Sequence, residues 1–505
     1  MKFLSKLILA SIITMSISCE SDDNDPIIEP TNTNVNFQHK TTINIGGEGA
    51  SEITAFDPIS KNLFTVNVES EQIAVYNISN LDVPQQQNAI ELSAYGSPNS
   101  VAVNNGKLAI AVESHIKQNL GKILLFNTSD SSLINEFTVG SLPDMVTFSK
   151  DGKLIISANE GEPNNDYSVD PEGTISIIDI EKGITTTLNF SNFNADEAAL
   201  KNKGFRVFGP NATLAKDVEP EYITVSEDSK IAWVSLQENN GIAKINLESK
   251  SIIDIYPLGF KDYNLNGNEI DASDKDGSKE IKKWPIKSMY QPDAITSVNI
   301  NGVEYIISAN EGDSRDYDGF SEEERVSKLI LDETAFPASE DFQNEINLGR
   351  LKITTTLGDT DNDGDYDELY SYGARSFSIW SENIDLIYDS GNNIASETLS
   401  LSPDRFNDND KRSDDKGAEP ESVEILNIGN ERYILFVGLE RNDQVLIYDI
   451  TNPNAPQFLN ILSHPGDEAP EGLLVIPATD SPNGKDLLVV SNEDSGTVSI
   501  YENKQ

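Results

Sequence analysis

Carboxylates recur at two fixed positions of a repeated unit in this sequence. The unit is clearest in residues 142–180, where Pro143-Asp144 precedes one apolar run and a second apolar run ends at Glu160. Two antiparallel strands joined by the Asp151-Gly152 turn bring the start of the first strand next to the end of the second. We therefore expect Asp144 and Glu160 to lie at the same end of the strand pair.

The same two positions are acidic in most of the other copies. Six further copies begin at Gly49, Ser97, Glu219, Gln291, Glu419 and Ala469. The first position holds Asp144, Glu221, Asp293, Glu421 and Glu471, with Ser51 and Asn99 in the two remaining copies. The second position holds Glu69, Glu113, Glu160, Glu238, Glu311, Glu440 and Glu493. So many carboxylates in one place either bind cations or have raised pKa values. We interpret the first set as cation-binding; acceptance of backbone hydrogen bonds at turns explains the second set equally well.

A run of aspartates forms the sharpest local motif. Carboxylates alternate along the segment with a glycine, Gly364, at its sixth position, and they are Asp359, Asp361, Asp363, Asp365 and Asp367. This spacing lets a loop wrap its oxygens around calcium, although Tyr370 stands where an EF-hand has its bidentate glutamate. A solvated acidic turn is the alternative. Residues 262–277 form a weaker second candidate of the same kind.

Basic residues are scarce, and a few lie among the acids of the long loops. These are Arg315, Arg375, Arg405, Arg412 and Lys416. Beside bound calcium, Arg315 and Arg375 are candidates for holding an anion such as phosphate. Structural ion pairing is the commoner role of such arginines, and we favour it. The three histidines show no ligand spacing, which disfavours a histidine-based zinc site.

The elements that position these residues are short strands. Seven copies of a strand-turn-strand unit, each followed by a third strand, predict an all-β, seven-bladed β-propeller over residues 36–503. We expect the N-terminal strand near residues 36–46 to close the last blade. The long insertions fall on one face, at residues 161–173, 190–218, 260–290, 312–375 and 396–418. Within them, short helices are predicted from Asn194 and from Ser321, the second with a capping box to Glu324.

The N-terminus carries a targeting signal. Residues 1–18 are basic and then apolar, and they end in small residues before Cys19, which resembles a bacterial lipoprotein signal with lipidation of Cys19. An ordinary secretory signal is the alternative. Residues 19–35 are polar and predict a flexible tether. We expect attachment to the outer membrane or cell surface through the lipid.

The charge balance constrains the partners. A formal net charge of −47 argues against nucleic acid as a partner. We expect a monomer that binds cations and an unknown surface ligand or a phosphorylated small molecule.

Several longer motifs together resemble one family. The segments SANEGEPNNDY, EPEYITVS, MYQPDAITS, ANEGDSRDY and RSDDKGAEPESV are similar to the choice-of-anchor I family, and the repeats resemble YVTN-type propeller repeats. The resemblance covers about residues 40–503. It implies a secreted or surface-attached protein, because members are held by varied anchors. Some members are named alkaline phosphatase-like or mesenchyme-specific cell surface glycoprotein.

Two functions follow from these observations. The first is a calcium-stabilised surface propeller that binds a ligand or partner without chemistry. The alternative is a calcium-dependent, alkaline phosphatase- or phytase-like phosphoesterase. In the second, Asp144, Glu160, Asp293 and Glu311 hold the metal and Arg315 or Arg375 steadies the phosphate.

Overall fold

The computed structural model describes residues 35–504. The predicted signal sequence, Cys19 and nearly all of the predicted tether lie outside the described residues. Among the described residues, no helix has the length and apolar character needed to cross a membrane.

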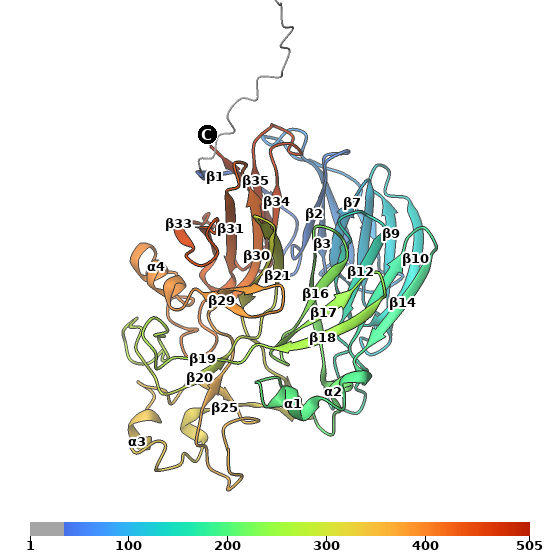
Figure 1. Cartoon of the computed structure of the whole chain (residues 1–505). Coiled ribbons are helices and arrows are strands. Elements are labelled where there is room, and N and C mark those ends of the chain that lie inside the picture. The colour runs from blue at the N-terminus through green and yellow to red at the C-terminus, as the bar shows by residue number, and fades with distance from the viewer. Residues whose placement is uncertain (1–34, 505) are drawn as a thin grey trace, which may run out of the picture.

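Strands dominate the described chain, and most belong to seven sheets of four or five strands (Figure 1). One sheet contains β2 (Thr54–Asp57), β3 (Asn62–Asn67), β4 (Gln72–Asn77), β5 (Gln85–Gln86) and β6 (Ile90–Glu91). The next contains β7 (Pro98–Asn104), β8 (Lys107–Val112), β9 (Leu120–Asn127) and β10 (Leu133–Ser141). A third contains β11 (Pro143–Phe148), β12 (Leu154–Asn159), β13 (Thr174–Asp179) and β14 (Ile184–Asn189). A fourth contains β15 (Pro220–Val225), β16 (Ile231–Leu236), β17 (Gly241–Asn246) and β18 (Ser251–Pro257).

The remaining three large sheets follow the same antiparallel order. One contains β21 (Ile295–Ile300), β22 (Val303–Asn310), β28 (Ser376–Ser381) and β29 (Leu386–Asp389). Another contains β30 (Pro420–Asn427), β31 (Tyr433–Leu439), β32 (Gln444–Asp449) and β33 (Gln457–Leu462). The last contains β34 (Pro470–Ile476), β35 (Leu487–Asn492), β36 (Thr497–Asn503) and β1 (Phe37–Asn44).

The two ends of the described chain meet in this last sheet. Strand β1 pairs antiparallel with β36, from Phe37 opposite Asn503 to Asn44 opposite Thr497. The pairing covers the outer edge of β36, which would otherwise expose unpaired backbone groups.

Burial explains why these segments form strands. In the third sheet, β13 (TISIID) is buried along almost its whole length, whereas β14 (ITTTLN) is mostly exposed or half-buried. Middle strands are apolar on both sides because neighbouring sheets pack against both of their faces. One such core joins Ile123 and Phe137 of the second sheet to Ile155 and Ile178 of the third.

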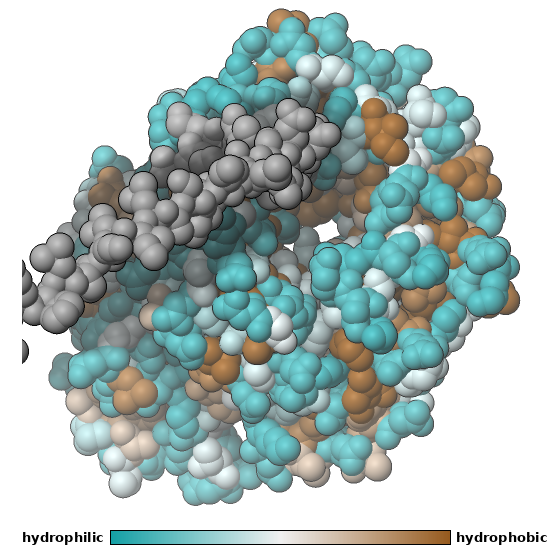
Figure 2. All heavy atoms as spheres, turned by 45° about the horizontal axis from the view of Figure 1, so that its top comes forward, coloured by the Kyte–Doolittle hydropathy of each residue, from teal (hydrophilic) through white to brown (hydrophobic). Residues whose placement is uncertain are grey.

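The first strands of the seven sheets surround a common axis. They contact one another in chain order, and β34 contacts β2. A cavity of about 260 Å³ lies between these strands. The face turned forward in Figure 2 shows a hollow near its centre. This arrangement is that of a β-propeller, so the predicted all-β propeller class is confirmed.

The long insertions build a separate layer on one face, at the lower side of Figure 1. Their strands are β19 (Phe260–Asp262), β20 (Lys287–Met289), β23 (Asp316–Tyr317), β24 (Phe320–Ser321), β25 (Glu323–Arg325), β26 (Lys352–Thr354) and β27 (Tyr370–Ser371). The helices are α1 (Glu197–Lys201), α2 (Leu214–Asp217), α3 (Ser339–Phe342) and α4 (Asn393–Leu401), with 3₁₀ turns η1 (Ser191–Phe193) and η2 (Val326–Lys328). A further 3₁₀ turn, η3 (Glu440–Asn442), joins β31 to β32. Insertions 260–290 and 312–375 share a small core that includes Tyr263, Ile286 and Leu351. This shared core was not predicted.

One of the two predicted helices is wrong. The segment from Ser321 forms β24, β25 and the short turn η2, and β25 pairs with β26. Glu322, between β24 and β25, points inward and is fully buried against Arg206. Glu324 accepts a hydrogen bond from the neighbouring Arg325 N–H and forms no capping box. Tertiary pairing therefore outweighs local helix propensity here. The helix predicted after Asn194 is confirmed as α1.

Candidate functional site

The predicted inner acids surround one cavity of about 360 Å³ at the starts of the first strands. Its acidic lining residues include Glu52, Asp144, Glu221, Asp293, Glu311, Glu421, Glu440 and Glu471. Lys416 and Arg441 are the basic residues of this lining. We call this cavity the carboxylate mouth.

A recurring backbone contact brings the two acidic positions together. The residue before the proline is left-handed, with φ values of 48° at Leu142, 51° at Glu419 and 57° at Ala469. Its carbonyl accepts the backbone N–H of the glutamate that ends the second strand, at 2.9 Å from Glu160 and 2.8 Å from Glu493. A left-handed non-glycine residue costs about 1 kcal/mol or more, and this hydrogen bond offsets part of that cost. The strand pair therefore holds both acids at one end.

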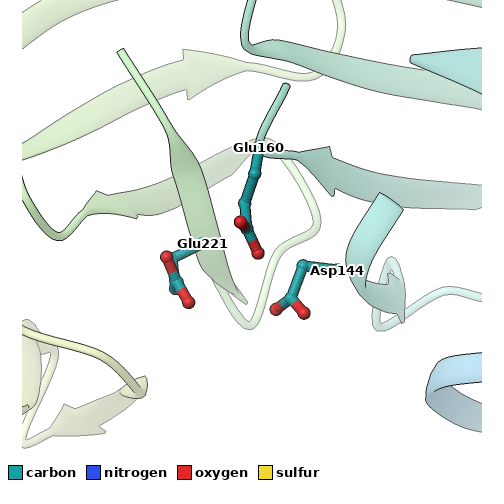
Figure 3. Close-up of side chains that lie close together, drawn as sticks. All are labelled: Asp144, Glu160 and Glu221. Carbon is teal, nitrogen blue, oxygen red and sulfur yellow. The ribbon is translucent and has the colours of Figure 1, made fainter. Parts of the chain in front are cut away.

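Three carboxylates converge without a direct ion pair on one side of the mouth. Asp144 is the second residue of β11, Glu160 follows β12, and Glu221 belongs to β15 of the next sheet (Figure 3). One oxygen of each lies within 4.8 Å of the others. Within residues 35–504, none of these carboxylates has a hydrogen bond or ion pair. We call this group the open triad.

The surroundings of the open triad disfavour three free negative charges. Burial, together with repulsion from Asp293, raises the pKa of Asp144 to about 7. Burial and the neighbouring acids also raise the pKa values of Glu160 and Glu221 well above the usual range. Protons or a bound cation are the two ways to relieve this repulsion.

A second group of three carboxylates occupies the same repeat positions two sheets further along. Asp293, Glu311 and Glu421 each offer an oxygen, and these oxygens lie within 4.8 Å of one another. Lys416 forms an ion pair with Glu311, and Gln237 Nε2 donates a hydrogen bond to Glu311 Oε2 at 2.8 Å. We call this group the capped triad.

Glu419 strengthens the positive side of the mouth. It lies within 4.0 Å of Lys416, Arg412 and Arg441. Although burial opposes the shift, these cations hold the pKa of Glu419 below its usual value. The capped triad therefore lies beside a network of ion pairs that the open triad lacks.

The sequence did not identify Glu52 or Arg441 as residues of the mouth, nor the contact that Lys416 makes there. We assigned Ser51 to the inner position of the first copy, but its neighbour Glu52 lines the cavity instead. Burial raises the pKa of Glu52 to about 8. The signal in the sequence for this role was that Glu52 is acidic and directly follows Ser51. Lys416 was noted as a loop cation, but its contact with Glu311 arises from residues far apart in the chain.

The aspartate loop brings some of its predicted ligands together. Oxygens of Asp359, Asp361 and Asp367 lie within 4.8 Å of one another, and Asp365 and Asp367 form a similar group with Asp332. Asp332 comes from a different segment and was not predicted.

Asp363 and the adjacent Glu368 stay outside these converging groups. Asp363 accepts the Asp365 N–H at 3.1 Å and joins neither group. Glu368, the acid that follows the loop, forms an ion pair with Lys287 at 2.7 Å.

The weaker loop near residue 270 does not converge in the same way. No carboxylates of residues 262–277 appear among the converging groups of the described chain. Asp274 pairs with Arg350 at 2.5 Å, and Asp276 pairs with Lys282 at 3.7 Å. These contacts are those of a polar structural loop.

Both candidate anion-binding arginines lie buried outside the mouth lining. Arg315 is 2% exposed and pairs with Asp217 at 2.7 Å and Glu219 at 2.9 Å. Arg375 is 8% exposed and donates to the carbonyl oxygens of Asp271 at 2.7 Å and Ser413 at 3.0 Å. These contacts agree with the structural role that we favoured.

The fold and site define a β-propeller whose carboxylate mouth lies on the face that carries the long insertions. A family model, the choice-of-anchor I domain, matches residues 52–453. The chain belongs to this family.

Two curated proteins and one solved structure are similar to the chain. Gigasin-3a of Magallana gigas is 34% identical over 189 residues, which cover 32% of this chain and 66% of that protein. A mesenchyme-specific cell surface glycoprotein of Strongylocentrotus purpuratus is 26% identical over 325 residues, covering 54% of this chain and 41% of that protein. The chain thus spans less than two thirds of either relative.

The solved structure supports the fold alone. Hydrazine synthase of Kuenenia stuttgartiensis matches with a TM-score of 0.50 and 12% identity, covering 90% of this chain and 96% of that chain. At this identity the likeness says nothing about activity.

Proposed function

We propose that this protein is a cell-surface β-propeller that binds calcium in its carboxylate mouth and uses the loop-rich face to bind a ligand or partner. The open triad carries the proposal. Its three carboxylates converge without forming an ion pair, and the nearby charge of Lys117 only partly offsets their mutual repulsion. Calcium prefers carboxylate oxygens and takes six to eight ligands, so three acids leave positions for water or a ligand group.

A fourth acid supports a cation at this place. Glu238 Oε2 is buried without a hydrogen-bond partner. Its charge contributes to the raised pKa values of Glu160 and Glu221. The charge of Arg315 stabilises this carboxylate in part. A divalent cation near it would offset the remaining cost of burying the charge.

Family membership and one relative support the surface location. The family is described by its anchoring, and one similar protein is named as a cell surface glycoprotein. The predicted lipid on Cys19 would attach this chain to the outer membrane or cell surface. The aspartate loop, residues 359–367, is a further calcium candidate that would stabilise the insertion layer.

The detailed architecture is part of the same proposal. The seven large sheets would be the seven blades of one propeller, with β1 completing the last blade. The antiparallel pairing of β1 with β36 and the contact between β34 and β2 support this view.

Calcium titration of the purified protein tests the mouth. We expect Asp144→Asn combined with Glu160→Gln to remove one bound calcium, measured by isothermal titration calorimetry. Asp254→Asn combined with Glu181→Gln is the matched control, because it removes the same two charges from exposed positions outside both calcium candidates. An unchanged calcium count and affinity in the mouth variant would show that the open triad is not a calcium site.

A further inference from the structure

The two triads occupy equivalent positions in the repeat, so the open triad can be compared directly with the capped triad. Asp144 corresponds to Asp293, Glu160 to Glu311 and Glu221 to Glu421. The preceding segments also correspond, since Lys216-Asp-Val-Glu219-Pro-Glu221 aligns with Lys416-Gly-Ala-Glu419-Pro-Glu421. Each triad therefore has one lysine at the same sequence distance.

The two lysines lie differently. The Lys416 side chain is 14% exposed, pairs with Glu311 of its triad and lies 3.5 Å from Glu419. The Lys216 side chain is 45% exposed and pairs with Asp170 at 3.7 Å, away from the open triad. Arg315 takes the contact with Glu219 instead, at 2.9 Å.

The capped triad retains an oxygen without a partner. Glu421 is 9% exposed, and its Oε2 is buried with no hydrogen bond. The same residue lines the mouth, so this oxygen belongs to a group that surrounds the cavity. The three carboxylates are therefore arranged as a cation site. The Lys416 ammonium already pairs with one of them, Glu311.

We infer that the Lys416 ammonium takes the place of a second divalent cation in the capped triad. The mouth then binds one divalent cation at the open triad, and the residue at position 416 decides whether a second one binds at Asp293, Glu311 and Glu421. This inference rests on the calcium binding proposed for the open triad. A lysine carries one positive charge on a flexible stem and fills such a place without a metal.

Replacing the lysine tests the inference. Lys416→Met keeps the apolar stem and removes the charge, so calcium titration should show one more bound ion than the unchanged protein. Lys216→Met is the matched control and should leave the count unchanged, because Lys216 does not contact a triad. Terbium luminescence should rise in parallel in the Lys416 variant only.

The folding of the Lys416 variant and the location of the bound ions are measured separately. Without calcium, the Lys416 variant should melt at a lower temperature, and calcium should restore more of its Tm than it does in the unchanged protein. If Lys416→Met does not fold, Lys416→Gln serves as the second variant. In addition, anomalous diffraction from terbium-soaked crystals of the unchanged protein should place an ion at the open triad and none at the capped triad.

The outcomes separate the two proposals. If Asp144→Asn with Glu160→Gln removes no ion, the open-triad proposal fails. If that variant loses its ion but neither folded Lys416 variant gains one, only the inference about Lys416 is overturned. A terbium ion among Asp293, Glu311 and Glu421 in the unchanged protein would also overturn it.

Discussion

Arg315 and Lys416 illustrate how single contacts determine which carboxylates near the mouth are paired with a cation. Arg315 satisfies Asp217 and Glu219 away from the cavity, whereas Lys416 reaches the capped triad. Both residues are basic and lie among acids in the sequence, so residue type alone does not separate their roles. Breaking either buried pair would leave an uncompensated carboxylate.

Glu424 provides a test of burial inside the channel, away from both triads. It lines the cavity between the first strands, and burial raises its pKa to about 7. The folded state therefore holds its proton more tightly than the unfolded state, whose pKa is near 4.5. Between about pH 5 and about pH 7 the folded protein binds more protons, so this group lowers stability as pH rises.

We expect Glu424→Gln to remove this decrease in the free energy of unfolding with rising pH, since glutamine stays neutral. Part of the side chain meets solvent, so the effect should be about 1–2 kcal/mol between pH 5 and pH 8. Urea unfolding at the two pH values measures it, with the exposed Glu181→Gln as control. An equal pH dependence in the unchanged protein and the Glu424 variant would contradict the expectation.

At the scale of elements, β1 contributes burial and edge pairing to the last sheet. It buries Phe37 against Phe436, with ring centroids 5.0 Å apart, and it buries Ile43 in another core. It also covers the edge of β36.

Deleting residues 1–45 should therefore lower the free energy of unfolding by at least about 3–6 kcal/mol, the burial of two large apolar side chains. Thermal unfolding of that protein against one beginning at residue 35 measures the effect, because the longer protein keeps β1. Equal Tm values would argue that β1 does not hold the last sheet.

At the scale of the whole molecule, the insertions determine whether the two candidate arginines can contact a phosphate at the mouth. They bury Arg315 and Arg375 in contacts with carboxylates and carbonyl oxygens. The phosphoesterase hypothesis needs one of these side chains beside a metal-bound phosphate, and neither lines the mouth.

We therefore expect no calcium-dependent hydrolysis of phosphomonoesters or phosphodiesters by the folded protein. A panel of such esters, assayed with calcium and then with a chelator, measures this. Turnover that the chelator abolishes, and that Asp144→Asn also removes, would favour the enzyme and contradict the binding function.

The sequence alone determined the propeller class and the acidic mouth. Both follow from a repeat whose turns and apolar runs are local, and whose inner acids fall at the same place in five of the seven units. Asp144, Glu221, Asp293, Glu421 and Glu471 were predicted around one mouth for this reason, and they line one cavity.

Tertiary structure decided which carboxylates are neutralised and how the insertions fold. Lys416 and Glu311 are more than 100 residues apart, and so are Arg206 and Glu322. The β25–β26 pairing likewise replaced the helix expected from Ser321. Local patterns do not encode such contacts, because the free energy that fixes them comes from burial and charge pairing between distant segments.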